Sequence, residues 1–230
     1  CDRSMLILAL ATAVGTSTLS ALRLSTPPSL RFAPLGRCAA TMSDVKKQVL
    51  VPIATGSEEI ETVCIIDTLV RAGAQVTVAS VMDELQVTCS RGVKLVADIP
   101  IGEAAGKAYD MIVVPGGMPG AEHLANSAPL TELLKAQASS GKLTAAICAA
   151  PVVVLAKHGL LEGKMATAHP AFSDKLPDQG PVPTRVVVDG NVITSRGPGT
   201  AIEFALKLAE LLFGEEKAKA VAGPMLVAGA

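Results

Sequence analysis

The sequence predicts an α/β protein in which helices cover both faces of a mostly parallel central sheet, a three-layer sandwich. Two observations support this fold class. Half of the 230 residues are apolar but only 2% are aromatic, so the core must consist mainly of small and branched aliphatic side chains. Short apolar runs alternate with helical patterns along the chain, as they do in sheets that are buried on both faces.

Each predicted strand is an apolar run bounded by turn residues. The runs cover residues 49–53, 76–79, 111–114, 143–147 and 186–194. The last run contains a hairpin turn at Asp189-Gly190. A helix is expected from about residue 129 to 138, and the proline-rich stretch 170–183 is expected to form a surface loop.

One run leads directly into a cysteine. The segment LTAAICAAP, residues 143–151, continues into a helix that opens at a proline. A side chain at a sharp strand-to-helix turn needs small neighbours, which Ala146, Ala149 and Ala150 provide, so the segment predicts a nucleophile elbow. The free N–H groups and positive dipole of a helix start favour a thiolate. Cys148 is therefore a candidate nucleophile, and the alternative is a small buried cysteine packed under the sheet.

A second run ends at a glycine pair, Pro115-Gly116-Gly117. Ligands of open α/β sheets bind at the carboxyl ends of strands, so this turn and Cys148 are expected at the same edge. Glycines there let backbone N–H groups face a ligand, which predicts an oxyanion hole; the alternative is a tight turn alone. The chain contains no G-x-G-x-x-G or Walker pattern, and hence no nucleotide fingerprint.

The segment ATGSEEIET begins the first predicted helix, with Ser57 as its N-cap and Gly73 as its stop. Acidic residues favour helix N-termini, so Glu58 and Glu59 are expected to be ordinary surface residues. Glu61 lies one turn into the helix, among apolar neighbours, where the helix start faces the strand ends. A desolvated carboxyl beside a cysteine would stay protonated and donate a hydrogen bond to the thiolate.

Seven segments together resemble the protein deglycase (DJ-one) branch of the ThiJ/PfpI superfamily over residues 47–227. They are ATGSEEIET, LVRAGAQVTVAS, VTCSRGVKLVAD, YDMIVVPGG, AAICAAP, ATAHP and ITSRGPGTAIEFAL, in the order and spacing of that family. The resemblance implies a flavodoxin-like domain over residues 43–230, a reactive cysteine and a homodimer.

The resemblance also implies roles for matching residues. It makes Cys148 the nucleophile and redox-sensitive thiol, Glu61 its protonated partner, His169 a nearby imidazole, and Gly116 and Gly117 the oxyanion-hole turn. It implies that Ala149, Ser195, Arg196 and Gly197 border the substrate pocket, that Asp67 and Arg71 form an ion pair, and that Cys89 lies near a dimer interface.

One departure narrows the implied function. The protease-like branch of the superfamily carries a histidine directly after the nucleophile, whereas this chain has Ala149. Peptidase activity is therefore not expected. His169 lies in ATAHP, which the pattern places at a strand end. It is either a base or a structural donor, and geometry must decide between these roles.

Composition excludes several functional classes. A net charge of -1 without a basic run argues against nucleic acid as the main partner. Five cysteines without a C-x-x-C pair, and three scattered histidines, predict neither a disulfide framework nor a metal site, so no cofactor is expected. The apolar run 6–14 is too short to span a membrane, and no membrane partner is expected.

Residues 1–42 differ in composition from the rest. From Met5 to Thr41 they contain arginine, serine and threonine but no acidic residue, which is typical of a transit peptide for a plastid or mitochondrion. The start at Cys1 indicates a fragment or a translation that begins upstream of the true start. The alternative is an untranslated leader with Met42 as the first residue, which would leave a cytoplasmic protein.

The resemblance implies conversion of methylglyoxal or glyoxal to hydroxy acids without glutathione, or deglycation of proteins by the same chemistry. Cys148 would add to the aldehyde, the Gly116-Gly117 turn would hold the oxygen, and Glu61, with His169 as a candidate helper, would move protons. The alternative is a redox sensor or chaperone in which Cys148 is oxidised to a sulfinate. Steady-state turnover distinguishes the two, because a sensor need not turn over.

Overall fold

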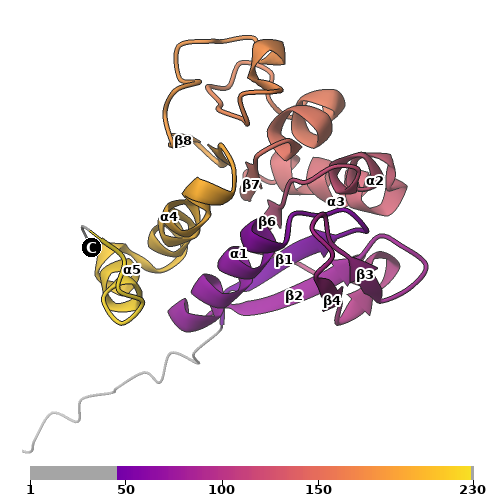
Figure 1. Ribbon diagram of the computed structural model, residues 1–230, viewed down its shortest axis with the longest axis horizontal. Coiled ribbons are helices and arrows are strands. Elements are labelled where there is room, and N and C mark those ends of the chain that lie inside the picture. The colour runs from indigo at the N-terminus through magenta and orange to yellow at the C-terminus, as the bar shows by residue number, and fades with distance from the viewer. Residues whose placement is uncertain (1–45, 229–230) are drawn as a thin grey trace, which may run out of the picture. The chain divides into compact units, whose positions relative to one another are not determined.

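The computed structural model describes residues 46–228. Within them, one sheet has the strand order β5-β2-β1-β6-β7-β9-β8, and all neighbours are parallel except the antiparallel pair β8–β9 (Figure 1). Its strands are β1 (Gln48–Ile53), β2 (Gln75–Ser80), β5 (Ile99–Pro100), β6 (Met111–Val114), β7 (Leu143–Ile147), β8 (Val186–Asp189) and β9 (Val192–Ser195). A separate antiparallel pair is formed by β3 (Gln86–Thr88) and β4 (Lys94–Val96). The mostly parallel sheet confirms the predicted fold class.

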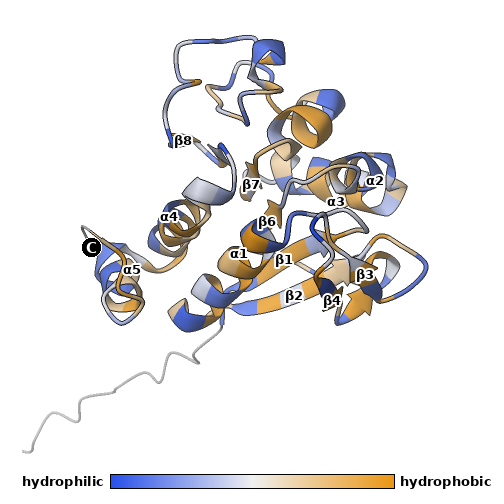
Figure 2. Cartoon of the chain, viewed as in Figure 1, coloured by the Kyte–Doolittle hydropathy of each residue, from blue (hydrophilic) through white to orange (hydrophobic). Residues whose placement is uncertain are grey.

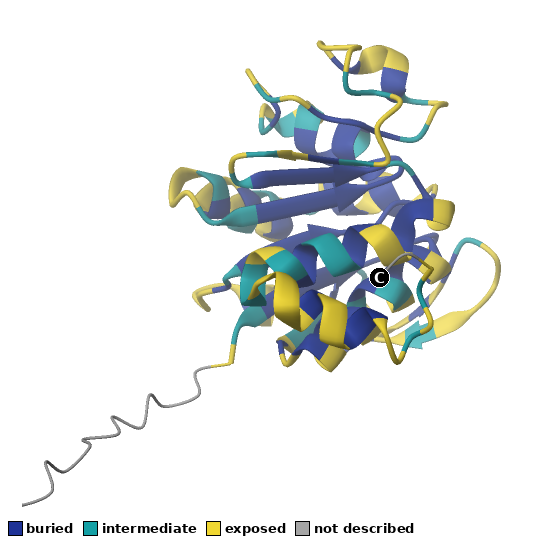
Figure 3. Ribbon diagram, turned by 90° about the vertical axis from the view of Figure 1, so that its left-hand side faces the viewer, coloured by how far each residue is buried: buried dark blue, intermediate teal, exposed yellow. Residues whose placement is uncertain are grey.

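Helices cover both faces of this sheet and make three layers, with buried strands between them (Figure 3). On one face lie α1 (Glu59–Ala72), α4 (Ala201–Phe213) and α5 (Glu215–Ala222). On the other lie α2 (Gly120–Asn126), α3 (Ala128–Ser139) and Pro151–Leu155, which forms a π-helical turn after the elbow.

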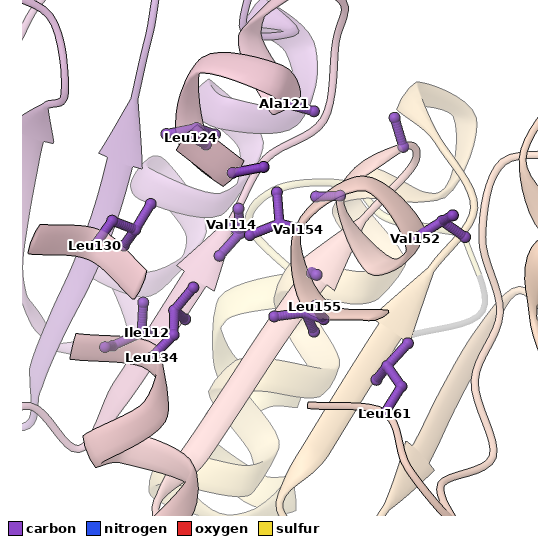
Figure 4. Packing of buried hydrophobic residues seen from close by; sticks show 14 of the residues in the cluster. Ile112, Val114, Ala121, Leu124, Leu130, Leu134, Val152, Val154, Leu155 and Leu161 are labelled. Carbon is purple, nitrogen blue, oxygen red and sulfur yellow. The ribbon is translucent and has the colours of Figure 1, made fainter. Parts of the chain in front are cut away.

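Alternating side chains of the central strands contribute to both halves of the core. In β1, Val49, Val51 and Ile53 pack on the α1–α4 side, whereas Leu50 packs on the α2–α3 side. This alternation follows from the strand geometry, which points successive side chains to opposite faces. Strands covered on both faces are apolar over most of their length, as Figure 2 shows for β1 and β6. Figure 4 shows the α2–α3 side, where β6 side chains meet leucines of both helices.

The predicted strand positions agree closely with the structure. The runs 49–53, 76–79, 111–114, 143–147 and 186–194 correspond to β1, β2, β6, β7 and the β8–β9 hairpin. Helix α1 ends at Gly73, whose φ of 103° belongs to the left-handed region that glycine adopts without strain. The stretch 170–183 is irregular apart from a 3₁₀ turn at Ser173–Lys175.

The start of α1 differs from the prediction. Its N-cap is Glu58, whose Oε2 accepts the Glu61 N–H at 2.7 Å. Ser57 closes the preceding turn, because its Oγ accepts the Ala54 N–H at 3.0 Å. The Ser57 cap was thus a wrong prediction: the serine hydroxyl is engaged before the helix begins.

The ATAHP segment, residues 166–170, is not a strand, which is a second correction. The Thr167 N–H donates to the Thr194 side-chain Oγ1 at 2.9 Å. A β-ladder consists of hydrogen bonds between the backbones of neighbouring strands. Because Thr167 donates to a side chain of β9 instead, the segment lies beside β9 without joining the sheet.

The predicted targeting segment, residues 1–42, lies outside the described residues and stays a prediction. Among residues 46–228, no helix has the length and apolar character needed to cross a membrane.

Candidate active site

Cys148 follows β7 directly in a backbone conformation that is rare for a side-chain-bearing residue, with φ at 66°. Two hydrogen bonds hold it there. The Cys148 N–H donates to the Ser195 carbonyl at 3.0 Å, and the His169 N–H donates to the Cys148 carbonyl at 2.8 Å. Such a conformation costs about 1–3 kcal/mol and persists only where the surroundings impose it. The backbone therefore has the form of the predicted elbow.

The turn after β6 approaches the elbow so closely that only glycine fits. A Cβ atom on Gly116 would lie 2.6 Å from the Cβ of Cys148. Gly117 has a φ of 88°, and a Cβ there would lie 2.4 Å from the backbone nitrogen of Glu58. The Glu58 N–H also donates to the Gly116 carbonyl at 2.9 Å. Backbone therefore packs on backbone where the segments after β1, β6 and β7 meet.

Glu61 lies beside the cysteine and is fully buried. Its Oε2 accepts the Gly116 N–H at 2.8 Å. Its Oε1 is also buried and makes no well-formed hydrogen bond within the described part of the chain. The carboxyl is close enough to the Cys148 thiol that each group shifts the pKa of the other. The structure thus brings together the two residues that the sequence singled out.

Burial raises the pKa of both acids. Burial raises the pKa of Glu61 to about 7, against the opposing effect of the Gly116 N–H. Burial, followed by the negative charge of Glu61, raises the pKa of the Cys148 thiol to about 12. Desolvation and the Glu61 carboxylate therefore act against the acidic thiol that the helix start was expected to give, while the N–H groups of Gly117 and Ala149 favour it.

The two acids form one coupled pair. Two buried acids side by side cannot both ionise easily, so near neutral pH the pair carries at most one negative charge. A proton moved from sulfur to Glu61 leaves that charge on the nucleophile. With its pKa of about 7, Glu61 is suited to accept and return this proton.

The backbone N–H groups at the sulfur come from Gly117 and Ala149, and both lower the pKa of Cys148. The sequence predicted Gly116 and Gly117 as the donor turn, but the Gly116 N–H is bound to Glu61. Gly116 therefore positions the carboxyl. An oxygen on a carbon bonded to the Cys148 sulfur would lie close to the N–H groups of Gly117 and Ala149, the arrangement of an oxyanion hole.

Ser195 stabilises the backbone of the Cys148 elbow and lines neither of the two cavities described below. It is fully buried, and its hydroxyl donates to the Arg185 carbonyl at 2.7 Å and lies 2.7 Å from the Thr200 hydroxyl. Its own carbonyl holds the Cys148 N–H. The predicted contact of Ser195 with a substrate is thus replaced by a positioning role.

His169 and Arg196 border a small cavity of about 280 Å³, together with Gly197. The His169 Nδ1 accepts the Ala171 N–H at 3.2 Å, and the contact of His169 with Cys148 is through the backbone. A proton-transfer role for His169 stays a prediction.

Glu58 and Glu59 were expected at the surface, yet both are buried. Glu58 caps α1. Glu59 accepts the Ser90 hydroxyl and the Arg91 N–H, each at 2.8 Å, and so ties the β3–β4 hairpin to α1. A run of acids at a helix start looks the same in sequence whether it faces solvent or a neighbouring loop, so no pattern in the chain distinguished these residues.

The other residues implied by the resemblance lie on or near α1. Asp67 and Arg71 form an exposed ion pair at 2.7 Å. Cys89 is buried, and burial raises its pKa to about 11. Cys64 is half-buried on α1, and burial raises its pKa as well.

A larger cavity, about 800 Å³, lies between α4, α5 and the C-terminal segment. Its lining contains neither cysteine nor histidine, so it is separate from the nucleophile. Within residues 46–228, no group of three histidine, cysteine, aspartate or glutamate side chains is placed to hold a metal ion.

Comparison with known proteins gives consistent matches. Residues 47–211 match the DJ-1/PfpI family model. Protein DJ-1 homolog B of Arabidopsis thaliana is 56% identical over 170 residues, which are 74% of this chain but 39% of that protein. The chain thus spans well under two thirds of this longer relative. A Caenorhabditis elegans protein named glutathione-independent glyoxalase DJR-1.2 is 40% identical over 189 residues, 81% of this chain and 100% of that protein.

A solved structure of a DJ-1 protein is also similar to this chain. Toxoplasma gondii DJ-1, described as oxidized, is 52% identical to this chain and has a TM-score of 0.75. The match covers 79% of this chain and 99% of that one.

We expect the substitution Glu61→Gln to remove a pH dependence of stability. Burial raises the pKa of Glu61 from 4.5 to about 7, so this group stabilises the fold fully below the unfolded-state value and loses that effect as the pH rises through 7. Between pH 5 and pH 8, the free energy of unfolding in urea should therefore fall by roughly 1–3 kcal/mol more in the unsubstituted protein than in Glu61→Gln. Equal changes in both proteins would contradict a buried, titrating Glu61.

Proposed function

Because the chain belongs to the DJ-1/PfpI family, we propose that it converts small reactive dicarbonyls such as methylglyoxal to 2-hydroxy acids, using Cys148 and neither glutathione nor a cofactor. The observation that carries this proposal is the buried pair of Cys148 and Glu61 beside the N–H groups of Gly117 and Ala149. The Caenorhabditis elegans relative, whose whole length matches 81% of this chain, is named a glutathione-independent glyoxalase.

In the first step, the Cys148 sulfur attacks the aldehyde carbon of the substrate. An S–C bond forms while the C=O π bond breaks, and the thiol proton passes to the Glu61 carboxylate. Concerted removal of this proton suits a thiol whose pKa burial raises. The N–H groups of Gly117 and Ala149 stabilise the negative oxygen until Glu61 passes the thiol proton to it, which gives a hemithioacetal and restores the Glu61 carboxylate.

In the second step, Glu61 moves a proton within the bound intermediate. Its carboxylate takes the proton from the former aldehyde carbon, and the neighbouring carbonyl oxygen gains a proton, which gives an enediol. The neighbouring carbon then gains a proton while the hydroxyl on the sulfur-bearing carbon loses one and becomes the C=O of a thioester. The product is a thioester of a 2-hydroxy acid, which water hydrolyses to free acid and thiol. The aldehyde carbon is oxidised and its neighbour is reduced, so the reaction is redox-neutral and needs no external electron acceptor.

The same addition of sulfur to an aldehyde-derived carbon would act on early glycation adducts of proteins. We include this deglycation in the proposal as a second substrate class for the same residues.

A second candidate function is redox sensing through Cys148. The oxidized state of the Toxoplasma structure favours this function, because the similarity covers 99% of that protein and 79% of this chain. A sulfinate at Cys148 would accept hydrogen bonds from the N–H groups of Gly117 and Ala149 and from protonated Glu61. Steady-state turnover decides whether this oxidation is the main role or a side reaction.

The proposal also includes a homodimer that forms through α1. Ile60, Val63 and Val70 on α1 are 46–53% exposed. Exposed apolar side chains on one helix favour burial against a second surface, and two copies of one helix can cover each other.

We expect Cys148→Ser to abolish lactate formation from methylglyoxal while the fold survives. A serine hydroxyl is much harder to ionise than a thiol, and Glu61, with its pKa of about 7, is too weak a base to compensate. The rate should fall to that of the uncatalysed reaction, with unchanged circular dichroism. The matched control Cys64→Ser should retain full activity. Turnover by folded Cys148→Ser would remove Cys148 from the mechanism.

Limited treatment with peroxide should produce sulfinate at Cys148 before the other four cysteines. Burial and nearby carboxylates raise the pKa of the Cys64, Cys89 and Cys148 thiols. Only at Cys148 do N–H groups, those of Gly117 and Ala149, oppose this effect. The same N–H groups would donate to the sulfinate oxygens. Peptide mass spectrometry of samples taken over time gives the order. Earlier oxidation of Cys64 or Cys89 would count against both the site and the sensor function.

Val63→Asp should convert a dimer to a monomer. The reason is that a carboxylate on each α1 would be desolvated and would repel its symmetry mate. Light scattering after size exclusion measures the mass. The control is Leu226→Asp, which introduces the same charge at a residue that is 90% exposed near the C-terminus. A monomeric unsubstituted protein, or a dimer that survives Val63→Asp, would rule out this interface.

A further inference from the structure

Glu58 is a buried carboxylate beside the reacting pair, and the proposed mechanism does not use it. It is 8% exposed, and within residues 46–228 it forms no salt bridge. Removing a carboxylate from water is costly unless a partner compensates for the loss. The compensation here comes from the positive end of α1 and from the Glu61 N–H. A charge kept at such a cost beside two titrating groups is typical of functional sites.

Glu58, Gly116 and Glu61 close a ring of three hydrogen bonds. The Glu58 N–H donates to the Gly116 carbonyl at 2.9 Å. The Gly116 N–H donates to the Glu61 carboxyl at 2.8 Å. The Glu61 N–H completes the ring, because it donates to the Glu58 carboxyl at 2.7 Å. The ring thus holds both the backbone and the carboxyl of Glu61.

The backbone of Glu58 joins α1 to the donor turn after β6. The Glu58 carbonyl accepts the Thr62 N–H at 3.1 Å and the Thr62 hydroxyl at 2.7 Å. On its other side, the Glu58 nitrogen lies so close to Gly117 that a Cβ atom there would be 2.4 Å away. Gly117 supplies one of the N–H groups at the Cys148 sulfur. Glu58 therefore contacts both the element that carries the base and the turn that carries a donor.

The charge of Glu58 acts on the same pair. Burial is the main reason why the pKa of Glu61 is about 7, and the negative charge of Glu58 contributes in the same direction, against hydrogen bonds from Gly116 and Cys148. Burial and then the nearby carboxylates, Glu58 first among them, raise the pKa of Cys64, so that thiol stays neutral near pH 7. A base that is half ionised near neutral pH can both accept and return a proton there.

We propose that Glu58 is a positioning residue, which holds the Glu61 carboxyl in place for proton exchange with Cys148 through the ring of hydrogen bonds. Its negative charge has a second effect, because it opposes ionisation of Glu61 and keeps this group the stronger base. The inference rests on the proposed function and adds to it the residue that sets the base. Glu58 acts through Glu61 and takes no part in the bonds that form and break.

Alkylation of Cys148 by iodoacetamide tests this role without requiring turnover. The sulfur bonds to the CH₂ group, iodide leaves with its electron pair, and the thiol proton passes to the Glu61 carboxylate. The rate should therefore rise with pH as Glu61 ionises, and then reach a plateau. Peptide mass spectrometry after short reactions between pH 5 and pH 9 gives the midpoint and the plateau at Cys148. Cys64 in the same samples reports a cysteine outside the ring.

We expect Glu58→Gln to move this midpoint to lower pH by roughly 0.5–1 pH unit, the effect of removing one nearby like charge. Glutamine keeps an oxygen for the Glu61 N–H, so the plateau should be retained. Alkylation of Cys148 at pH 6 should then become about three- to fivefold faster, because more of Glu61 is ionised there. Glu58→Asp keeps the charge and a residue that caps helices well, so its midpoint should match that of the unsubstituted protein.

Glu58→Ala removes the acceptor together with the charge. The Glu61 N–H then loses its partner, and the plateau rate at Cys148 should fall about tenfold because the base is no longer held against the thiol. In an assay of turnover, the same loss should appear in kcat with little change in KM.

Two controls on α3 separate this role from general effects of capping and charge. Ser127→Ala removes the N-cap of α3, where the Ser127 hydroxyl accepts the Leu130 N–H. This substitution should lower stability without moving the midpoint or the plateau. Glu132→Gln removes a charge from a side chain that is 78% exposed, and it should leave both quantities unchanged.

A folded Glu58→Gln protein with an unchanged midpoint, or a folded Glu58→Ala protein with a full plateau rate, would overturn the proposal. Glu58→Ser keeps a capping hydroxyl without the charge, and it repeats the first test if Glu58→Gln does not fold. The expected shifts in a protein that forms no lactate from methylglyoxal would refute the proposed turnover and still support the role of Glu58. The two failures are therefore distinguishable.

Discussion

The left-handed backbone of Cys148 is the constraint on which the site depends. A residue with a side chain adopts φ near 66° only when its surroundings hold it there, and two neighbouring segments do so through the Ser195 carbonyl and the His169 N–H. Gly116 completes the arrangement, since any Cβ at that position would collide with Cys148. The sheet order makes this possible, because β7 lies between β6 and β9 and all three are parallel. Their carboxyl ends therefore deliver the three segments to one edge.

The same packing sets the electrostatics of the site. Glu61 is removed from water by the close approach of the α1 start to the turn after β6, and this burial raises its pKa to about 7. The Gly116 N–H then orients the carboxyl toward the sulfur, so a backbone group required for steric reasons also positions the base. Burial acts against ionisation of the Cys148 thiol too. The mechanism that we propose therefore depends on proton exchange within the pair more than on a free thiolate.

The acidic turn at the start of α1 shows how three carboxylates within four residues acquire different roles. Glu58 caps the helix, Glu59 fastens the β3–β4 hairpin, and Glu61 faces the cysteine. Glu58 lies before the helix in extended backbone, whereas the different directions of Glu59 and Glu61 follow from the rotation of about 100° per residue along a helix. The hairpin, the elbow and the glycine turn are thereby attached to one structural element.

Local sequence determined much of this protein. Apolar runs with their bounding turns located β1, β6, β7 and the β8–β9 hairpin, because a strand covered on both faces must be apolar throughout. Small residues around Cys148 and a glycine pair after β6 identified the elbow and its neighbour, since both depend on the steric needs of adjacent backbone.

Only the tertiary structure decided the roles that depend on partners distant in the chain. The Glu61 carboxyl meets Gly116 across 55 residues, and Glu59 meets Ser90 across 31. The carbonyl of Ser195, which comes from β9, holds Cys148. No local pattern records such contacts, so buried acids looked like surface acids, and the desolvation that acts against ionisation of the Cys148 thiol was not visible in the sequence. Hydrogen bonds and desolvation act through space, and their effect on a side chain is set only once the layers of the fold have packed together.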